Sequence, residues 1–432
     1  MTEHHHHILT KLPIVPMMES ACHTKGGAAN LAGDTNDADR QDHPHRDERC
    51  DGSHGVPTTS RQIDPRHSGS GGGVTAPDGT TIQVEPILVG RNEAKLRHIA
   101  QTHGLEEIST DIDTVMTRDD VDVYFDAQTT SRRHQALRQA IEAGKHVYTE
   151  KPTAGTLDQA IELATLARRR GIIDGVVHDK LYLPGLVKLR RLVDMGFFGR
   201  ILSMRGEFGY WAWEGTDIPA QRPSWNYRKT SGGSITTDML PHWSYVIEGL
   251  IGPIHDVYSQ TATHISERVD EAGMSDTTDA DAEANAIFNA TTSSGDPVVV
   301  QMNSSWDTRV FREELVEFQI DGTAGSAVAG LFECLCQPRG VTPRPTWNPD
   351  LPDIHDYMSM WQRVPSNGTA PDGSIENGFK TQWEEYLIDV AAGSRHRFDL
   401  ASGARGVQLA QLGLLSAEQG RRINVPEITV EA

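Results

Sequence analysis

A lysine, an aspartate and a histidine in this chain have the types and spacing that transfer of a proton and a hydride requires. Lys151 lies in Glu150-Lys151-Pro152, directly after the apolar run 146–149, and Asp238 and His242 are four residues apart. On a helix that spacing points both side chains the same way. When a carbinol carbon gives up a hydride, a base must take the hydroxyl proton and a cation must stabilise the developing negative charge. We predict that Lys151, Asp238 and His242 are catalytic, with His242 and Lys151 able to supply the base and the cation.

The elements around Lys151 alternate between strand and helix, which is typical of a dinucleotide-binding domain. The predicted strands are Pro86–Val89, Val121–Asp126, His146–Thr149 and Gly175–His178. The predicted helices are Glu93–His103, Ser131–Ala143 and a third between Thr156 and Gly171. This alternation indicates a parallel sheet, whose ligands collect at the carboxyl ends of the strands. We therefore assign residues 73–178 to such a domain and expect Lys151 to face its crevice.

From about Gly199 the apolar residues recur with a period close to two, which predicts strands. These are Ile201–Gly209, Asp256–Ile265, Ala282–Ala290, Val298–Ser305 and Leu315–Asp321. Because no crossover helix fits between most of them, we predict one open, largely antiparallel sheet. An ordered loop over 337–367 and helices at Phe379–Ala392 and Ala404–Glu418 follow. Residues 179–432 are thus predicted to be an α+β domain for substrate binding and oligomerisation.

Residues 1–72 differ in composition from the rest of the chain. They contain no Phe, Tyr or Trp and nine of the nineteen histidines, which is typical of disorder. No strand followed by a glycine-rich phosphate loop, with which a dinucleotide domain opens, is recognisable there. We hypothesise a frameshift, because residues 45–68, back-translated and read one nucleotide later, permit a strand end, a glycine-rich loop and an amphipathic helix. The alternative is an unrelated disordered extension in place of the loop.

Charge and composition exclude several classes of function. The net charge of −20 repels phosphate backbones and anionic membranes, so we expect no nucleic-acid or membrane partner. No apolar stretch approaches the length of a membrane helix and the start has no signal-peptide core, so we expect a cytoplasmic protein. The four cysteines are too few and too poorly spaced for a disulfide framework or zinc site. Without an acidic or cysteine framework, the consecutive histidines 4–7 do not predict a metal site.

The two motifs together resemble the Gfo/Idh/MocA oxidoreductases, which include glucose-fructose oxidoreductase and inositol dehydrogenase. The resemblance covers roughly residues 73–425. It implies a Rossmann-like α/β domain followed by the open-sheet domain, and hydride transfer between NAD or NADP and a sugar, cyclitol or related polyol. It also implies that Lys151 contacts the nicotinamide ribose and the reacting hydroxyl, while Asp238 contacts the substrate or holds His242. Without this pattern, the simpler interpretation is that Lys151 is a solvated lysine at the start of a helix and that His242 is a histidine in the core.

The cofactor-binding residues are predicted from the ends of the strands. Gly90, Arg91 and Asn92 follow the first predicted strand, where an arginine in place of an acidic residue suits the 2′-phosphate of NADP. A first-turn arginine on a surface helix is equally common, so the preference for NADP over NAD is slight. The remaining predicted cofactor contacts lie after the next two strands: Asp126, Thr129, Thr130, Glu150 and Lys151. His134 matches a helix histidine of the family and is predicted to be structural.

The substrate-binding residues are predicted in the second domain. Lys180 follows the strand that ends at His178, where the family commonly has a basic residue, and His242 is expected to contact the substrate as well. Trp225, Tyr227 and Arg228 combine an aromatic face with forked donors, as a sugar pocket requires. The same residue types are enriched at subunit contacts, which is the alternative role of this loop. We predict a homodimer or homotetramer that associates through the face of the open sheet.

Two other functions stay open from the sequence. A chain without a phosphate loop could be a catalytically impaired remnant that binds sugar without turnover. Alternatively, tightly held NAD could support an internal oxidation and reduction, as in the glycosidases of this family. Binding of NADPH and release of reduced cofactor during turnover separate these possibilities from a dehydrogenase.

Overall fold

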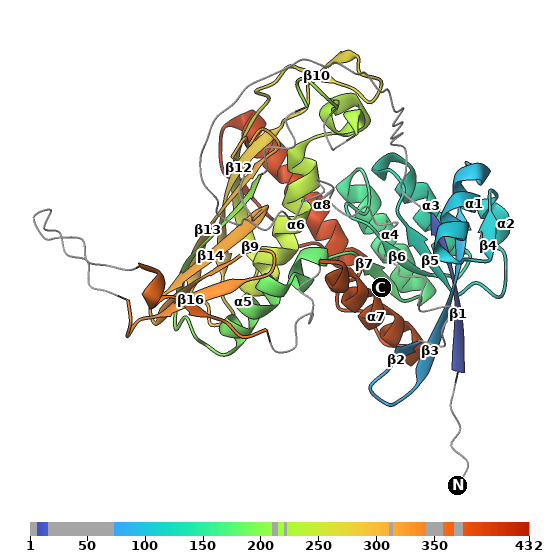
Figure 1. The fold of residues 1–432 in the computed structure, drawn as a ribbon, viewed down its shortest axis with the longest axis horizontal. Coiled ribbons are helices and arrows are strands. Elements are labelled where there is room, and N and C mark those ends of the chain that lie inside the picture. Colours follow the sequence, from blue (N-terminus) through green and yellow to red (C-terminus); the bar gives the residue numbers. More distant parts are fainter. Residues whose placement is uncertain are drawn as a thin grey trace, which may run out of the picture.

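The computed structural model describes residues 7–15, 73–209, 215–219, 223–310, 314–342, 357–366 and 375–431. They form two domains, each built on its own large sheet, with helix α8 (Leu400–Gln419) running between them (Figure 1). None of the described helices is long and apolar enough to span a bilayer.

The amino-terminal domain has a parallel sheet with helices on both faces. Its strands run in the order β3, β1, β5, β6, β7, with β4 paired to β3 and β2 added antiparallel at the start of β3. The strands are β1 (His7–Val15), β2 (Val74–Thr75), β3 (Thr81–Val89), β4 (Glu107–Ser109), β5 (Val123–Asp126), β6 (His146–Thr149) and β7 (Asp174–Val176). The helices are α1 (Glu93–His103), α2 (Ile112–Met116), α3 (Thr130–Glu142) and α4 (Leu157–Arg170). This strand order is that of a Rossmann fold, which confirms the predicted fold class.

One strand of this sheet contradicts the prediction. Residues 7–15 form β1, which lies in the centre of the sheet, parallel to both β3 and β5. The prediction that no strand precedes residue 73 is therefore wrong. Pro13 and Lys11 disguised it, because a proline cannot donate to the ladder and normally argues against a central strand. The segment 45–68, on which the frameshift hypothesis rests, lies outside the described residues, as do His4 to His6.

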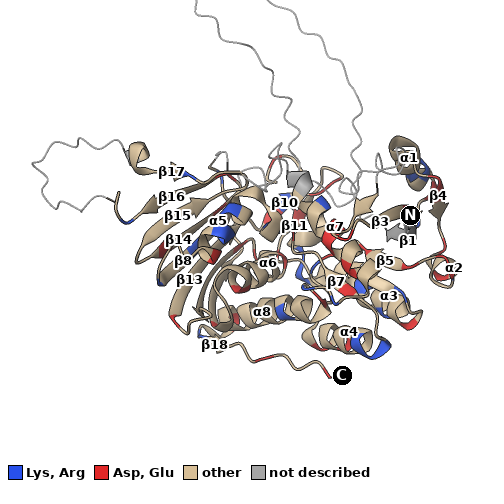
Figure 2. Ribbon diagram, turned by 90° about the horizontal axis from the view of Figure 1, so that it is seen from below, with Lys and Arg blue, Asp and Glu red and all other residues tan. Residues whose placement is uncertain are grey.

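Local signals fix the helices of this domain. Asn92 accepts a hydrogen bond from the Lys95 amide at 3.0 Å and so begins α1. Thr156 caps α4 by accepting from the Gln159 amide at 3.3 Å, and Gly171 ends α4 at φ 66°. The arginines 168–170 in its last turn oppose the negative end of the helix dipole (Figure 2).

The second domain is built on a nine-stranded sheet in the order β17, β16, β15, β14, β8, β13, β12, β9, β18. Only β8 and β13 pair in parallel among these neighbours, so the sheet is largely antiparallel, as predicted. The strands are β8 (Ile201–Gly209), β9 (Ile254–Ala262), β12 (Glu283–Thr291), β13 (Pro297–Ser305), β14 (Val316–Gly322), β15 (Gly325–Ala329), β16 (Cys334–Pro338), β17 (Gln362–Arg363) and β18 (Ile423–Asn424). A separate hairpin joins β10 (Glu267–Val269) to β11 (Ser275–Thr277).

Helices cover one face of this sheet. Helices α5 (Pro184–Asp194), α6 (Ile235–Leu250) and α8 lie on the side that faces the Rossmann domain (Figures 1 and 2). Their apolar residues, with the inward residues of the strands, form the largest core, which includes Trp243, Phe288 and Phe318. The opposite face carries no helix among the described residues.

The two carboxy-terminal helices both contact the Rossmann domain. Helix α7 (Ile375–Ala392) packs on the Rossmann sheet, where Trp383 and Tyr386 stack around Tyr148 of β6. Helix α8 contributes Leu400 and Val407 to the core beside α4, and Leu409 to the core of the second domain. Helix α7, which lies within the predicted second domain 179–432, therefore packs on one face of the Rossmann sheet.

Candidate active site

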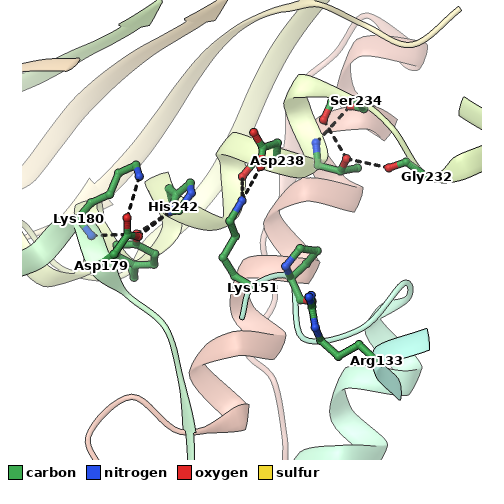
Figure 3. Close-up of polar contacts among 11 residues, drawn as sticks. Arg133, Lys151, Asp179, Lys180, Gly232, Ser234, Asp238 and His242 are labelled. Atoms are coloured by element: carbon green, nitrogen blue, oxygen red, sulfur yellow. Dashed lines mark hydrogen bonds and ion pairs between the residues drawn. The ribbon is translucent and has the colours of Figure 1, made fainter. Parts of the chain in front are cut away.

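Lys151 of the Rossmann domain reaches α6 of the second domain. Its Nζ donates to Asp238 Oδ1 at 2.6 Å and to the main-chain oxygen of Asp238 at 2.8 Å (Figure 3). Each of the two side chains is 13% exposed. The pair therefore joins the carboxyl end of β6 to the first turn of α6, and Lys151 is held away from bulk water with its charge compensated.

The start of α6 is fixed by a buried carboxylate. Ser234 caps the helix by accepting from the Thr237 amide at 3.2 Å, and its Oγ donates to Asp281 Oδ2 at 2.9 Å. The Thr236 amide donates to the same oxygen at 3.1 Å. A Cβ on Gly233 would lie 2.3 Å from the main-chain oxygen of Asn226. Only glycine therefore allows the chain before α6 to pass this close to Asn226. The glycine motif and Asp281 together place Asp238 and His242 on one face of α6.

His242 belongs to a second cluster, which the sequence did not predict. Its Nδ1 is 2.5 Å from the hydroxyl of Tyr245, and that hydroxyl donates to Asp179 Oδ1 at 2.9 Å. Asp179 Oδ1 is also 3.5 Å from His242 Nδ1, and Lys180 Nζ donates to Asp179 Oδ2 at 3.2 Å (Figure 3). The structure thus brings Lys180 into the His242 cluster, and it adds Asp179 and Tyr245.

Burial sets the protonation of the groups around this cluster. It raises the pKa of Glu150 to about 7, and the negative charge of Asp179 adds to the rise. Burial, and then Asp179, also raises the pKa of Tyr245 well above its usual value, so the phenol keeps its proton. His178 stacks on Tyr245 with ring centroids 4.1 Å apart, and burial lowers its pKa to about 3. His178 is therefore uncharged at neutral pH.

Asp126, whose contact with a cofactor stays a prediction, has a structural role at the end of β5. Its buried carboxylate accepts from Arg133 Nε at 2.9 Å, from the Tyr124 hydroxyl at 2.9 Å and from Gln128. Arg133 also donates to the main-chain oxygens of Gln128 and Pro152. This ion pair fixes the turn after β5 against the turn that carries Lys151. His134, predicted to be structural, pairs with Glu162 at 3.0 Å.

The other predicted cofactor residues lie at the carboxyl ends of the parallel strands. Gly90 follows β3, and a Cβ there would lie 3.2 Å from Leu96 of α1, so glycine permits the tight turn. Arg91 is exposed beside it, whereas the side chain of Asn92 caps α1. Thr129 and Thr130 begin α3, with Thr129 exposed. Together with Lys151, these residues fit a dinucleotide laid across the strand ends, although the segment after β1 lies outside the described residues.

The residues predicted to form the sugar pocket have different surroundings in the structure. Tyr227 is buried, with its ring edge-on to Trp306 at 5.7 Å and beneath the Arg268 guanidinium at 4.7 Å. Its role in substrate binding stays a prediction, and its packing against Arg268 and Trp306 is an additional role. Arg228 forms an ion pair with Asp276 of β11. Trp225 is partly buried in a 3-10 helix, Ser224–Tyr227, that precedes the start of α6.

Comparison with known proteins identifies the arrangement. Residues 81–178 match an oxidoreductase family with an NAD-binding Rossmann fold, and residues 186–328 match the GFO/IDH/MocA C-terminal domain. A D-xylose dehydrogenase of Paenarthrobacter nicotinovorans is 59% identical over 359 residues, which are 83% of this chain and 91% of that protein. The chain belongs to the Gfo/Idh/MocA family. It is an oxidoreductase that acts on CH-OH groups.

More distantly similar oxidoreductases share the fold. A levoglucosan dehydrogenase of Pseudarthrobacter phenanthrenivorans is 24% identical over 263 residues, or 57% of this chain and 65% of that protein. The structure of a levoglucosan dehydrogenase in complex with NADH and L-sorbose superposes with a TM-score of 0.68 at 20% identity, covering 85% of this chain and 96% of that one. An NAD-binding oxidoreductase from Klebsiella pneumoniae superposes with a TM-score of 0.67 at 20% identity, covering 81% and 92%. At these identities the superpositions establish the architecture alone.

Proposed function

We propose that this protein is an NAD(P)-dependent sugar dehydrogenase whose substrate is an aldose of the size of D-xylose. The observation that carries the proposal is the ion pair of Lys151 with Asp238, which lies on α6 one helical turn before His242 and its cluster. The identity of 59% to a D-xylose dehydrogenase, across 91% of that protein, supports the choice of sugar.

Each residue of the site has a task in this reaction. When bound, the nicotinamide accepts or returns the hydride. The ammonium of Lys151 stabilises the negative charge that develops on the sugar oxygen, and Asp238 holds that ammonium at 2.6 Å. The imidazole of His242 takes the hydroxyl proton. Lys180 and Trp225 are proposed to contact the remaining hydroxyl and C-H groups of the sugar.

An activity screen tests the proposal. Formation of reduced nicotinamide is measured for D-xylose, other aldoses, cyclitols and linear polyols, with NAD and with NADP. We expect turnover of D-xylose by the native chain and none by Lys151→Ala, with Lys380→Ala as an exposed lysine control. Tight sugar binding without turnover would point instead to the impaired remnant, and turnover without released reduced cofactor to the internal redox cycle.

We propose that NADP is preferred over NAD. The turn after β3 offers the exposed Arg91 and no carboxylate at residues 90–92, where an acidic side chain would bind the ribose hydroxyls of NAD. Arg91→Ser should therefore raise the KM for NADP and leave that for NAD nearly unchanged. Arg97→Ser is the matched control, because Arg97 is exposed on α1 and pairs with Glu93. Equal KM changes for both cofactors would contradict the preference.

The assembly is proposed to be a homodimer or homotetramer that uses the helix-free face of the nine-stranded sheet. Val299 of β13 is 52% exposed on this face, and Ile287 of β12 is 37% exposed nearby. Such apolar side chains among polar neighbours suit an interface between copies of the chain.

A further inference from the structure

The pair of Asp179 and Tyr245 determines which ring nitrogen of His242 carries the hydrogen. We infer that these two act as positioning residues that hold His242 with its hydrogen on Nδ1, which leaves Nε2 as the atom that accepts the substrate proton. The inference deepens the proposed function and rests on it. Neither residue belongs to the strand-end or glycine motifs from which the site was predicted.

The direction of the hydrogen bonds follows from the donors that are present. The Tyr245 hydroxyl has one hydrogen, which goes to Asp179 Oδ1 at 2.9 Å, and its oxygen also accepts from the Lys180 amide at 3.3 Å. His242 Nδ1 is 2.5 Å from the same oxygen. Two acceptors cannot share this contact without a hydrogen. Nδ1 must therefore be the donor, and Asp179 at 3.5 Å from Nδ1 favours a hydrogen there as well.

This arrangement has a consequence for the proton transfer. The sugar O-H bond breaks and an N-H bond forms on Nε2. The electron pair left on the oxygen forms the C=O bond, and the C-H hydrogen would leave as hydride to a bound nicotinamide. The resulting imidazolium donates from Nδ1 to the Tyr245 hydroxyl, which in turn donates to Asp179. The negative charge of Asp179 stabilises the imidazolium. With the opposite tautomer, Nε2 would already carry a hydrogen and could not act as the base.

The charged groups around His242 determine how the effect is measured. Besides Asp179, these are Lys180 from the turn after β7, Glu150 and Lys151 from the end of β6, and Asp238 from the preceding turn of α6. His178, stacked on Tyr245, is neutral and contributes no charge at neutral pH. Because the pKa of Glu150 is about 7 and the charge of Asp179 contributes to it, the pH profiles with and without Asp179→Asn are compared in a Glu150→Gln background.

The first test reads the tautomer directly, without cofactor or sugar. Protein labelled with nitrogen-15 in its histidines is studied by long-range proton-nitrogen NMR correlations, and His242→Gln assigns the His242 signals. We expect Nδ1 to be protonated in the native protein, and a mixture or the opposite tautomer in Tyr245→Phe. Tyr258→Phe, a tyrosine substitution on β9, should leave the pattern unchanged. A native His242 with its hydrogen on Nε2, or a tautomer unaffected by Tyr245→Phe, would overturn the inference.

The second test is kinetic. Tyr245→Phe should lower kcat on the order of 10- to 100-fold, as loss of a partner of a functional histidine does, with a change in KM below about threefold. Asp179→Asn should also move the acidic limb of the kcat profile to lower pH, because the neutral amide no longer favours the imidazolium. A rise in KM at unchanged kcat would contradict the inference. If the native protein turned over no sugar while its NMR spectrum showed the expected tautomer, the proposed function alone would fail.

Discussion

Removing the ammonium of Lys151 should separate its role in stability from its role in catalysis. The substitution Lys151→Met keeps the length of the side chain and leaves Asp238 without its partner at 2.6 Å. Removing one member of a fully buried ion pair costs about 3 to 5 kcal/mol, whereas an exposed pair contributes about 0 to 1 kcal/mol. At 13% exposure of each side chain, we expect a loss of about 2 kcal/mol in the free energy of unfolding.

The double variant Lys151→Met/Asp238→Asn removes both charges and provides the control. It should regain stability to within about 1 kcal/mol of the native protein, because no unpaired charge remains. Its activity should not return, since the cation is still missing. Loss of one preorganised donor to a developing oxyanion lowers kcat by roughly 100- to 1,000-fold, or about 3 to 4 kcal/mol. Catalysis and stability should therefore respond differently to the second substitution.

The assays are urea unfolding followed by tryptophan fluorescence, and formation of reduced nicotinamide at saturating sugar. The reasoning would be refuted if Lys151→Met kept the native kcat, or if the double variant recovered activity together with stability. The second result would mean that Lys151 serves only to neutralise Asp238.

Three further predictions concern stability and assembly. Because the pKa of Glu150 is raised from 4.5 to about 7, the native state binds more protons than the unfolded state between these values, and stability falls as pH rises through that window. Glu150→Gln should flatten the slope of the urea midpoint against pH, and parallel slopes would contradict this. Arg133→Leu should destabilise the protein by about 3 kcal/mol by stranding the buried Asp126, measured by urea unfolding, whereas the exposed Arg138→Leu on the same helix should have little effect. Val299→Lys should reduce the mass measured by light scattering to that of a monomer, while Met195→Lys, also exposed, should not; an unchanged mass for Val299→Lys would exclude that face.

The parts of the site that follow from local sequence were predictable. Lys151 is placed by a strand end, and Asp238 and His242 by a four-residue spacing on α6. Asp179 and Tyr245 were missed because their partnership depends on docking of the turn after β7 against α6, which no local pattern encodes. A tyrosine three residues after His242 places the two rings within reach on a helix, and this spacing was the available signal.

Long-range packing also explains contacts that the sequence did not predict. Asp126 ends a strand, as a cofactor residue would. Arg133, seven residues later, donates to its buried carboxylate and compensates its charge. Tyr227 lies in a polar, aromatic loop that suggested a pocket, and the structure buries it with Arg268 over its ring and Trp306 perpendicular to it. Helix α7 was assigned to the second domain by its place in the chain. Its aromatic residues instead pack on one face of the Rossmann sheet.

The central claim is that Lys151 and the His242 cluster act together on one sugar hydroxyl beside a nicotinamide. The most direct measurement is the near-ultraviolet absorbance of reduced nicotinamide after the purified protein is mixed with D-xylose and NADP or NAD. We predict steady formation of reduced cofactor by the native protein, and rates reduced by at least about 100-fold in both Lys151→Met and His242→Gln. A native protein that reduces neither cofactor with any aldose or polyol, or a His242→Gln variant as active as the native protein, would contradict the claim.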